Sequence, residues 1–364
     1  MPVQPFSIDP DIRRASTLPA ELYHDPAWYA VQRERIHARS WQLVQGAERV
    51  KAPGHLLPFT FLEGCVDEPM VLAIGDDAEP RCLSNVCTHR GTVVCEGETH
   101  AKGLRCRYHG RRFGLDGKMT FMPEFDGVEN FPTPADDLRR LPLERWGPLH
   151  FAAVDPACPF DEWIGPVRER CGFLPLDDFH FDPSTSRDYL IRAHWALYVD
   201  NYLEEFHIPY IHASLADTLD YATYRTETFA WCNLQLGTTK NRDEAFALPA
   251  GHPDEGTLVA AYYWWLFPNL MLNFYPWGLS VNVVRPLGPD RTRVSFLSYV
   301  WDESKRAAGA GADLHRVEME DEEVVEAVQK GVRSRIYHRG RYSPRREVGT
   351  HHFHTILARE IGGG

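Results

Sequence analysis

The 364-residue sequence has no excess of basic residues, no long hydrophobic run and no internal repeat. Its 39 Lys and Arg against 51 Asp and Glu give a formal charge of −12, which argues against a nucleic-acid partner. The most apolar stretch, residues 259–279, is broken by Pro268 and Pro276, whereas a membrane span needs about 20 mostly apolar residues. No apolar segment follows a basic start at the N-terminus, so we expect no export signal, no membrane anchor and a cytoplasmic location.

The composition also gives no sign of a disulfide framework or of disorder. Eight cysteines in a chain without an export signal are expected to stay reduced. Hydrophobic residues make up 43% and charged residues 25%, as in soluble globular proteins. The length is sufficient for two domains, each with a core of its own.

The pattern of apolar residues divides the chain into three parts. Residues 1–42 contain a helical segment at 18–42, which we expect to pack on the third part. Residues 43–153 contain short apolar runs separated by Gly, Asp and Pro, which predicts a small turn-rich β domain. Residues 154–364 mix helical and strand patterns, so the predicted class is α+β.

The third part has the clearest individual elements. Residues 194–206 predict a helix that ends near Pro209. Apolar spacing predicts a further helix over 317–335, with a stripe of Val324, Val325, Val328, Val332 and Ile336. Four antiparallel strands are expected at residues 257–267, 270–275, 279–285 and 291–301.

Two short motifs each pair a cysteine with a histidine. Cys87 and His89 form a C-x-H motif, and after sixteen intervening residues Cys106 and His109 form a C-x-x-H motif. In a Rieske [2Fe–2S] cluster, two cysteines bind one iron and two histidines bind the other. A glycine close behind each pair allows a tight loop whose N–H groups approach the cluster. The four residues therefore predict a Rieske cluster.

Two other kinds of metal site were weighed against this interpretation. A structural Cys₂His₂ zinc site has its cysteines in one motif and its histidines in another, whereas each motif here has one of each. A four-cysteine cluster of Cys82, Cys87, Cys95 and Cys106 matches plant-type spacing only in its first gap. We therefore expect Cys82 and Cys95 to be core residues.

A second pair of histidines, His207 and His212, follows an acidic helical segment. Residues five apart are not neighbours on a helix, but Pro209 between them breaks the helix and lets the second histidine turn back. Two histidines and a carboxylate on one face of an iron leave positions for O₂ and substrate, as in Fe(II) oxygenases. The pair by itself is a weak signal, because such histidines are more often core or surface residues.

The segments CTHRG and CRYHG, with residues 83–86 and 111–113 beside them, resemble the cluster loops of Rieske non-heme iron oxygenases. The resemblance extends over about residues 18–357. It implies an all-β Rieske domain and a helix-grip catalytic domain, in which an antiparallel sheet wraps around a helix. It also implies a head-to-tail homotrimer and a flavin or iron–sulfur reductase, with or without a ferredoxin, that supplies electrons from NAD(P)H. The cluster would pass them to one mononuclear Fe(II) per chain, which activates O₂.

The same resemblance points to the carboxylate ligand of the iron. In the family this residue opens a helix that carries an E-x-x-Q motif, and the corresponding segment here is residues 320–329. The match indicates Asp321. An acidic first turn of a helix is also favoured by the helix dipole, so three neighbours stay open as rivals: Glu318, Glu320 and Glu322.

Further residues take roles by the same resemblance. In the family, a carboxylate three residues before the first histidine ligand bridges to a Rieske histidine of a neighbouring subunit; Glu204 has this spacing, and Glu205 is the alternative. Asp200 is expected to hydrogen-bond to an iron ligand. Three histidines near the C-terminus are expected to be structural or to support the site: His351, His352 and His354.

The segments DNYLEEFHIPYIH and FPNLMLNFYPWG look most like the choline and betaine monooxygenases of this family. We therefore expect hydroxylation or oxidative N-demethylation of a small molecule, with a quaternary ammonium held by cation–π contacts. The same aromatic residues could stack on a ring, so mono- or dihydroxylation of an aromatic compound stays open, as does a Rieske electron-transfer protein without catalysis. The residues expected to line the pocket are Tyr262, Tyr263, Trp264, Trp265, Phe274, Tyr275 and Trp277.

Overall fold

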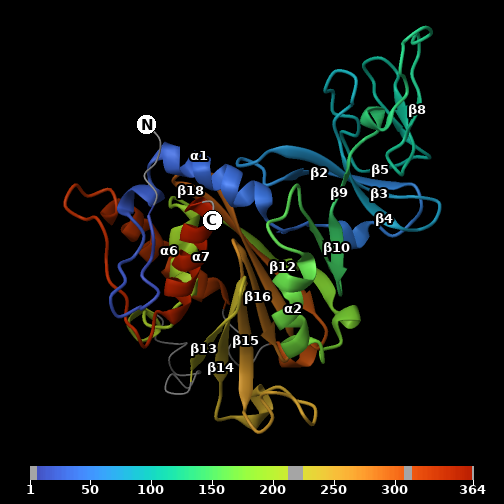
Figure 1. Cartoon of the computed structure of the whole chain (residues 1–364). Coiled ribbons are helices and arrows are strands. Elements are labelled where there is room, and N and C mark those ends of the chain that lie inside the picture. The colour runs from blue at the N-terminus through green and yellow to red at the C-terminus, as the bar shows by residue number, and fades with distance from the viewer. Residues whose placement is uncertain (1–5, 212–223, 307–313, 363–364) are drawn as a thin grey trace. The chain divides into compact units, whose positions relative to one another are not determined.

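The computed structural model describes residues 6–211, 224–306 and 314–362. Its contacts divide the chain into two compact units, residues 38–156 and residues 1–37 together with 157–364. The first unit is built from β-strands and the second from helices around an antiparallel sheet (Figure 1), so the predicted α+β class is confirmed.

The smaller unit contains eleven of the described strands in three antiparallel sheets. Their bounds are Gln42–Leu43 (β1), His55–Phe61 (β2), Glu68–Ile74 (β3), Pro80–Ser84 (β4), Thr99–His100 (β5), Leu104–Arg105 (β6), Arg112–Phe113 (β7), Met119–Phe121 (β8), Arg140–Leu141 (β9), Leu143–Trp146 (β10) and Leu149–Ala152 (β11). The strand orders are β5-β2-β3-β4-β9, β6-β7-β8 and β1-β11-β10.

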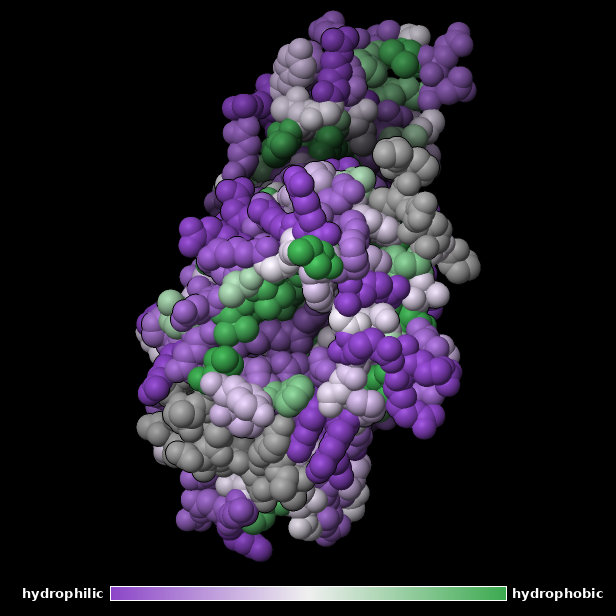
Figure 2. All heavy atoms as spheres, turned by 90° about the vertical axis from the view of Figure 1, so that its left-hand side faces the viewer, coloured by the Kyte–Doolittle hydropathy of each residue, from purple (hydrophilic) through white to green (hydrophobic). Residues whose placement is uncertain are grey.

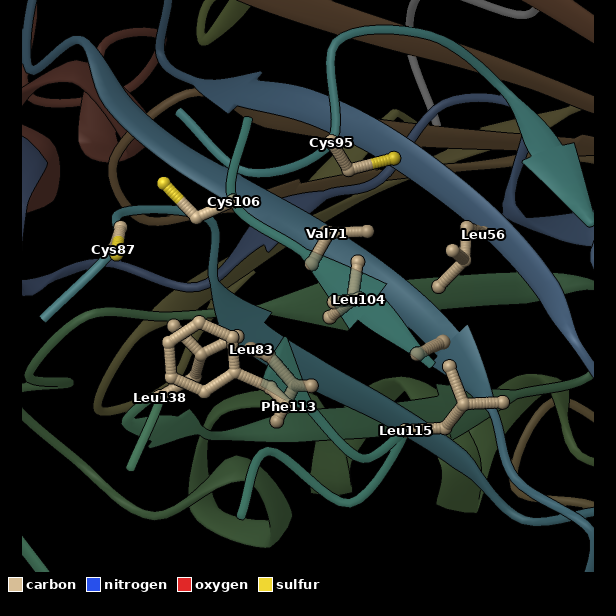
Figure 3. Close-up of a cluster of buried hydrophobic side chains, with 11 residues drawn as sticks. Leu56, Val71, Leu83, Cys87, Cys95, Leu104, Cys106, Phe113, Leu115 and Leu138 are labelled. Atoms are coloured by element: carbon tan, nitrogen blue, oxygen red, sulfur yellow. The ribbon is translucent and has the colours of Figure 1, made fainter. Parts of the chain in front are cut away.

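The core of this unit joins the five-stranded sheet to the β6–β7 hairpin. Side chains from five strands meet in it, including Leu56, Val71, Leu83, Leu104 and Phe113. Figure 3 shows the cysteines of the two motifs at one end of this cluster, with the sulfur of Cys95 pointing away from them. Each buried aliphatic side chain contributes about 1.5–3 kcal/mol, so this core holds the two motif loops in place.

A seven-stranded antiparallel sheet, in the order β12-β18-β17-β16-β15-β14-β13, is the centre of the larger unit. The strands are His180–Ile191 (β12), Arg225–Thr228 (β13), Cys232–Thr238 (β14), Val259–Leu266 (β15), Leu270–Tyr275 (β16), Gly278–Gly288 (β17) and Arg291–Val300 (β18). The four strands that the sequence predicts are confirmed as β15 to β18. The other three are additional.

Helices cover both faces of this sheet, which is the predicted helix-grip arrangement (Figure 1). They are Pro26–Arg35 (α1), Phe160–Cys171 (α2), Trp195–Tyr202 (α3), Ile208–Ile211 (α4), Leu314–Gly331 (α6) and Val348–Gly362 (α7). Neighbouring residues of a strand point to opposite faces. Accordingly, Trp264 Nε1 donates to Cys171 Sγ of α2 at 3.3 Å, whereas the Trp265 ring packs 5.2 Å from that of Phe353 in α7.

Two helix predictions need correction. The helix expected over 18–42 is three short pieces, because Pro26 begins α1 behind the N-cap Asp25 and 3₁₀ turns flank it. The helix expected to end near Pro209 ends at Tyr202, and Pro209 instead lies in the first turn of α4. A proline is tolerated there because the first N–H groups of a helix have no partner within it.

The apolar stripe predicted for the helix now seen as α6 is only partly correct. Val325 and Val332 are buried, but Val328 is 43% exposed, and Ile336, beyond the end of the helix, is 89% exposed. The buried face instead includes the polar residue Gln329, which accepts from the His194 N–H at 2.6 Å. A polar residue therefore serves to join α6 to the start of α3.

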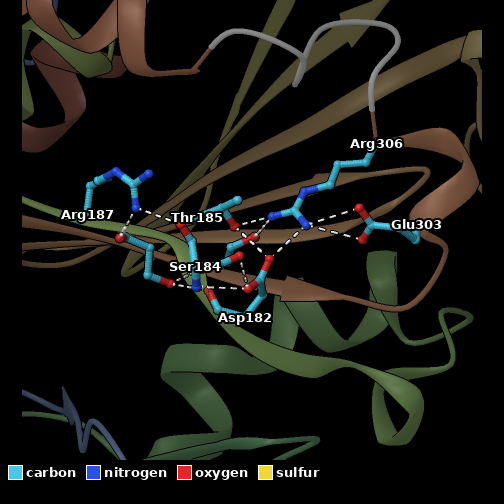
Figure 4. Close-up of polar contacts among 8 residues, drawn as sticks. Asp182, Ser184, Thr185, Arg187, Glu303 and Arg306 are labelled. Atoms are coloured by element: carbon cyan, nitrogen blue, oxygen red, sulfur yellow. Dashed lines mark hydrogen bonds and ion pairs between the residues drawn. The ribbon is translucent and has the colours of Figure 1, made fainter.

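A β-bulge bends β12 where its register against β18 shifts, between Asp182 and Arg187. Figure 4 shows the polar contacts around the bulge. The Asp182 carboxylate accepts from the Ser184 hydroxyl at 2.6 Å and from Arg306 at 2.7 Å. Arg306 also pairs with Glu303. Side chains also bond two backbone groups of the bulge: the Ser184 N–H donates to the Asp182 carboxylate at 2.9 Å, and the Ser186 hydroxyl donates to the Asp182 carbonyl at 2.8 Å.

The remaining broad expectations concern cysteines and surface. All eight cysteines are free and buried, including Cys82 and Cys95. Across the described ranges, no helix combines the length and the apolar character needed to cross a bilayer. Figure 2 shows a face on which hydrophilic side chains predominate and hydrophobic ones gather only in small patches.

The first prediction concerns the packing of α7 against the end of α3. A Cβ on Gly349 would lie 2.4 Å from the carbonyl oxygen of Leu203, so we expect Gly349→Ala to lower the free energy of unfolding by about 1–3 kcal/mol. In the control Gly165→Ala the new Cβ meets nothing within 4 Å, and the free energy should stay equal or rise by about 0.5–1 kcal/mol. Denaturant unfolding followed by circular dichroism measures both. Equal stability of the two variants would contradict this packing.

Candidate functional site

The two cysteine–histidine motifs form loops with the same backbone pattern. The Cys87 N–H donates to the Thr92 carbonyl, and the Cys106 N–H donates to the Arg111 carbonyl, five residues on in both cases. The backbone N–H of the glycine four residues after each cysteine donates to the carbonyl of that cysteine, at 2.9 and 3.0 Å. Both glycines have positive φ, +70° and +77°, which a residue with a side chain rarely adopts.

The donor atoms of these loops suit a cluster with two thiolates and two imidazoles. Burial raises the pKa of the Cys87 thiol, but backbone N–H groups two and three positions after Cys87 and Cys106 donate to the two sulfurs and act in the opposite direction. The rings of His89 and His109 lie 4.7 Å apart. Burial and the neighbouring His109 lower the pKa of His89, which keeps its imidazole neutral and able to bind a metal. Nδ1 of His89 is buried and has no hydrogen-bond partner among the described residues. The four residues therefore fit a Rieske cluster.

Buried Arg111 braces the two loops against each other. Its guanidinium donates to the Thr88 hydroxyl at 2.6 Å and pairs with Asp136 at 3.2 Å. Phe125 lies against both this guanidinium and the ring of His89. The first loop is thus fixed by side chains of the second loop and of residues 125–136.

The second pair of functional residues lies in the larger unit, where α3 and α6 face each other. Glu204 binds His207 twice: one carboxylate oxygen accepts from the backbone N–H at 3.0 Å and the other lies 2.6 Å from Nδ1. This contact assigns the proton to Nδ1 and directs Nε2 towards Asp321, whose Oδ1 is 3.5 Å away. Asn201 donates to the same Oδ1 at 3.1 Å. A carboxylate–histidine pair of this kind is typical of metal ligands.

The third expected ligand, His212, lies outside the described residues. Among those described, no group of three or more His, Cys, Asp or Glu side chains is arranged around one metal position. This agrees with the ligand sets expected here, because His207 and Asp321 are two of three, and each iron of a Rieske cluster takes only two protein ligands.

Two of the three rivals of Asp321 have other partners. Glu320 pairs with Arg316 at 3.1 Å on the helix surface, and Glu318 accepts from the Tyr198 hydroxyl at 2.6 Å. Glu322 is partly buried, and its raised pKa results from that burial and from Glu326. Asp321 is the member of this group that faces His207.

The two other expected site carboxylates point away from His207. Glu205 is buried and pairs with Arg346 at 2.9 Å. Asp200, expected to hold an iron ligand, instead binds His354 Nε2 at 2.6 Å and accepts from the Tyr23 hydroxyl at 2.8 Å. Its side chain faces the core between α3 and α7, so that expectation is corrected.

The histidines near the C-terminus all lie on α7. His354 binds the Asp200 carboxylate, His351 binds the carbonyl of Asp9 at 2.8 Å, and His352 contacts Asn233. Each therefore joins α7 to another segment.

A cavity of about 120 Å³ opens beside His207 and Asp321. Of the seven aromatic residues expected to line it, only Tyr263 and Tyr275 do. Trp264 faces α2 because strand residues alternate, and Trp265 packs on α7.

The sequence interpretation missed the polar wall of this cavity. Three amides, Gln235, Asn273 and Asn282, line it from β14, β16 and β17. Each interrupts a mostly apolar strand and is at most 4% exposed, and this contrast with its neighbours was the signal that could have identified it. Tyr198 and Tyr202 add aromatic surface from α3.

Two family models match this chain. A family model for the ring-hydroxylating alpha subunit (catalytic domain) matches residues 176–363, and a model for the Rieske [2Fe–2S] domain matches residues 40–132. The chain belongs to the Rieske ring-hydroxylating oxygenase family. It is therefore an oxygen-dependent oxidoreductase with a Rieske domain, and the resemblance drawn from its motifs is confirmed.

Individual relatives match over nearly the whole chain. Choline monooxygenase of Arabidopsis thaliana is 30% identical over 96% of this chain and 84% of its own length. The oxygenase subunit of carnitine monooxygenase of Escherichia coli K12 is 30% identical over 95% and 94%. The solved structure of a quaternary ammonium Rieske monooxygenase has a TM-score of 0.77 at 23% identity, covering 98% of this chain and all of that one.

The second prediction tests the cluster loops. We expect Cys87→Ser to abolish the visible and EPR signals of a Rieske cluster, because the variant loses a thiolate ligand. The matched control is Cys95→Ser, in the same core, whose sulfur contacts only the Gly97 carbonyl at 3.4 Å among its described hydrogen bonds. The control should keep both signals. An unchanged Rieske spectrum in Cys87→Ser would exclude this residue as a ligand.

Proposed function

We propose that this chain is a terminal oxygenase that hydroxylates or oxidatively N-demethylates a small quaternary ammonium compound. The observation that carries the proposal is the His207–Asp321 pair beside a cavity lined by tyrosines and carboxylates. Cations bind well over aromatic faces, and carboxylates add to this attraction. Relatives 30% identical over most of the chain are named for choline and carnitine, two quaternary ammonium compounds.

Each of the two sites would hold one metal group. Cys87, His89, Cys106 and His109 would hold the [2Fe–2S] cluster, and His207, His212 and Asp321 would hold the mononuclear iron. When bound, these groups supply the two electrons and the activation of O₂ by which one oxygen atom enters the substrate and the other leaves as water.

The protein's own residues fix the geometry of this reaction. Glu204 keeps the proton on Nδ1 of His207, which leaves Nε2 as the ligand atom. Asn201 donates to Asp321 and so sets the orientation of that carboxylate. Tyr202 donates its hydroxyl to Asn273 at 2.7 Å and thereby fixes the wall opposite.

Electrons are proposed to reach the iron site through Glu204. This carboxylate contacts His207 and is 16% exposed, so part of it can be reached from outside the chain. The proposal includes the expected head-to-tail homotrimer and an NAD(P)H-dependent reductase as the electron source. Inter-subunit electron transfer is described for a relative of known structure, the quaternary ammonium Rieske monooxygenase compared above.

A single-turnover experiment tests the reaction class. Protein loaded with cluster and iron is reduced chemically, then mixed with O₂ and with choline, carnitine or naphthalene. We expect an oxidised product, identified by mass, from a quaternary ammonium compound only. Asp321→Asn should keep the cluster spectrum but lose the mononuclear iron and all product, whereas Glu320→Gln should keep both, because Glu320 pairs with Arg316. Product from naphthalene alone, or from Asp321→Asn without iron, would contradict the proposal.

A fourth prediction tests the role of Glu204. Glu204→Gln should keep both metals, but its reduced cluster should reoxidise more slowly with O₂ and substrate, because charge-assisted hydrogen bonds are about twice as strong as neutral ones. Stopped-flow mixing of pre-reduced protein isolates this step.

The neighbouring carboxylate is the control. Glu205→Gln weakens the buried pair with Arg346 and should reduce stability while the reoxidation rate stays normal. Slow reoxidation of the cluster in Glu205→Gln with normal reoxidation in Glu204→Gln would assign the electron-transfer role to Glu205 instead.

A further inference from the structure

The cavity wall contains two buried polar atoms without a hydrogen-bond partner among the described residues. They are Oε1 of Gln235 and Oε1 of Glu318, and both are oxygens. An unpaired buried polar atom costs about 1–3 kcal/mol, so such atoms are rare unless something else satisfies them. A bound molecule that supplies the missing partners would recover this cost.

Gln235 requires a hydrogen-bond donor. Its Nε2 donates to the carbonyl of Tyr202 at 2.8 Å, and since a carbonyl only accepts, the amide cannot be turned the other way. Oε1 is therefore an acceptor in a side chain that is only 2% exposed. Among substrate groups, a hydroxyl would satisfy it and a carboxylate would not.

Glu318 provides an unpaired carboxyl oxygen that a cation can contact. Its Oε2 accepts from the Tyr198 hydroxyl at 2.6 Å, and the residue is 2% exposed. Burial raises the pKa of this carboxyl, although Tyr198 acts in the opposite direction, and a cation in the cavity would favour the charged form. The other two carboxylates of the described wall have other contacts: Glu204 binds His207, and Asp321 faces the proposed metal position.

The described part of the wall offers no Lys or Arg to an anionic group. Among the described residues that line the cavity there is no Lys or Arg, and His207 is the one basic side chain. Residues 212–223, which the structure does not describe, contain no Lys or Arg in the sequence either. A zwitterion such as carnitine or betaine would bring its carboxylate next to the acidic side chains without a cationic partner.

We propose that this oxygenase selects a quaternary ammonium alcohol without a carboxylate, a compound of the choline type, through two specificity residues. Glu318 faces the ammonium, and Gln235 accepts from the hydroxyl. Tyr263 and Tyr275 provide aromatic surface on the same wall, and the volume of about 120 Å³ restricts the occupant to a small molecule. This inference rests on the proposed function and narrows its substrate.

Calorimetric titration of the iron- and cluster-loaded protein, without O₂, tests the selection before any turnover. The probes are choline, glycine betaine, tetramethylammonium and 3,3-dimethylbutan-1-ol, which is choline with a neutral carbon in place of nitrogen. We expect choline to bind at least about tenfold more tightly than each of the others, a difference of about 1.4 kcal/mol in each case.

Two variants separate the two contacts. Glu318→Gln should weaken choline and tetramethylammonium about tenfold and leave the neutral alcohol unchanged. Gln235→Met should weaken choline about tenfold and leave tetramethylammonium unchanged; Gln235→Leu replaces it if the first variant does not fold. These opposite patterns distinguish a specific contact from a general loss of structure, which would weaken all four probes together.

The outcomes also separate this inference from the proposed function. Betaine binding as tightly as choline, or a Glu318→Gln protein that retains wild-type affinity for both cations, would overturn the selection while the quaternary ammonium class stands. No binding of any of the three quaternary ammonium ions would overturn both.

Discussion

The position of the candidate iron site depends on one half-buried carboxylate, Asp200 of α3. It binds His354 at 2.6 Å and Tyr23 at 2.8 Å, and Tyr342 binds the other ring nitrogen of that histidine at 2.6 Å. Each group would be left unsatisfied without its neighbours, at a cost of about 1–3 kcal/mol, so the four form one cooperative unit. The chain leads from this helix directly into Glu204. The residues that face the metal position are therefore held by contacts to the N-terminal segment and to α7.

A second set of contacts aligns α6 with α3 turn by turn. Tyr198 and Asn201 stand one helical turn apart and hold Glu318 and Asp321, which are also one turn apart. Both spacings are three residues, so the two bonds fix the rotation and the translation of one helix against the other. Asp321 lies opposite His207 because of this match. The polar residues on the buried face of α6 are thus an alignment device as well as parts of the site.

The sequence predicted those features that depend on residues close together in the chain. The spacing of Cys87, His89, Cys106 and His109 falls within 23 residues, and the loops that they form are determined by nearby glycines. The partners of Asp200 could not be predicted, because His354 is 154 residues away and only the packed fold brings them together. The cavity wall was missed for a different reason. The aromatic residues were treated as one set, although strand alternation sends neighbours to opposite faces.

The polar wall of the cavity also determines which ligands bind well. Once a ligand displaces solvent from the cavity, an oxygen of Gln235 or Glu318 that it leaves without a donor costs free energy. A ligand with a hydroxyl and a cation removes that cost, and one without them leaves it in place. Discrimination between substrates therefore comes from acceptors that the wrong ligand leaves unpaired. A zwitterion meets an additional repulsion, because its carboxylate would lie next to acidic side chains.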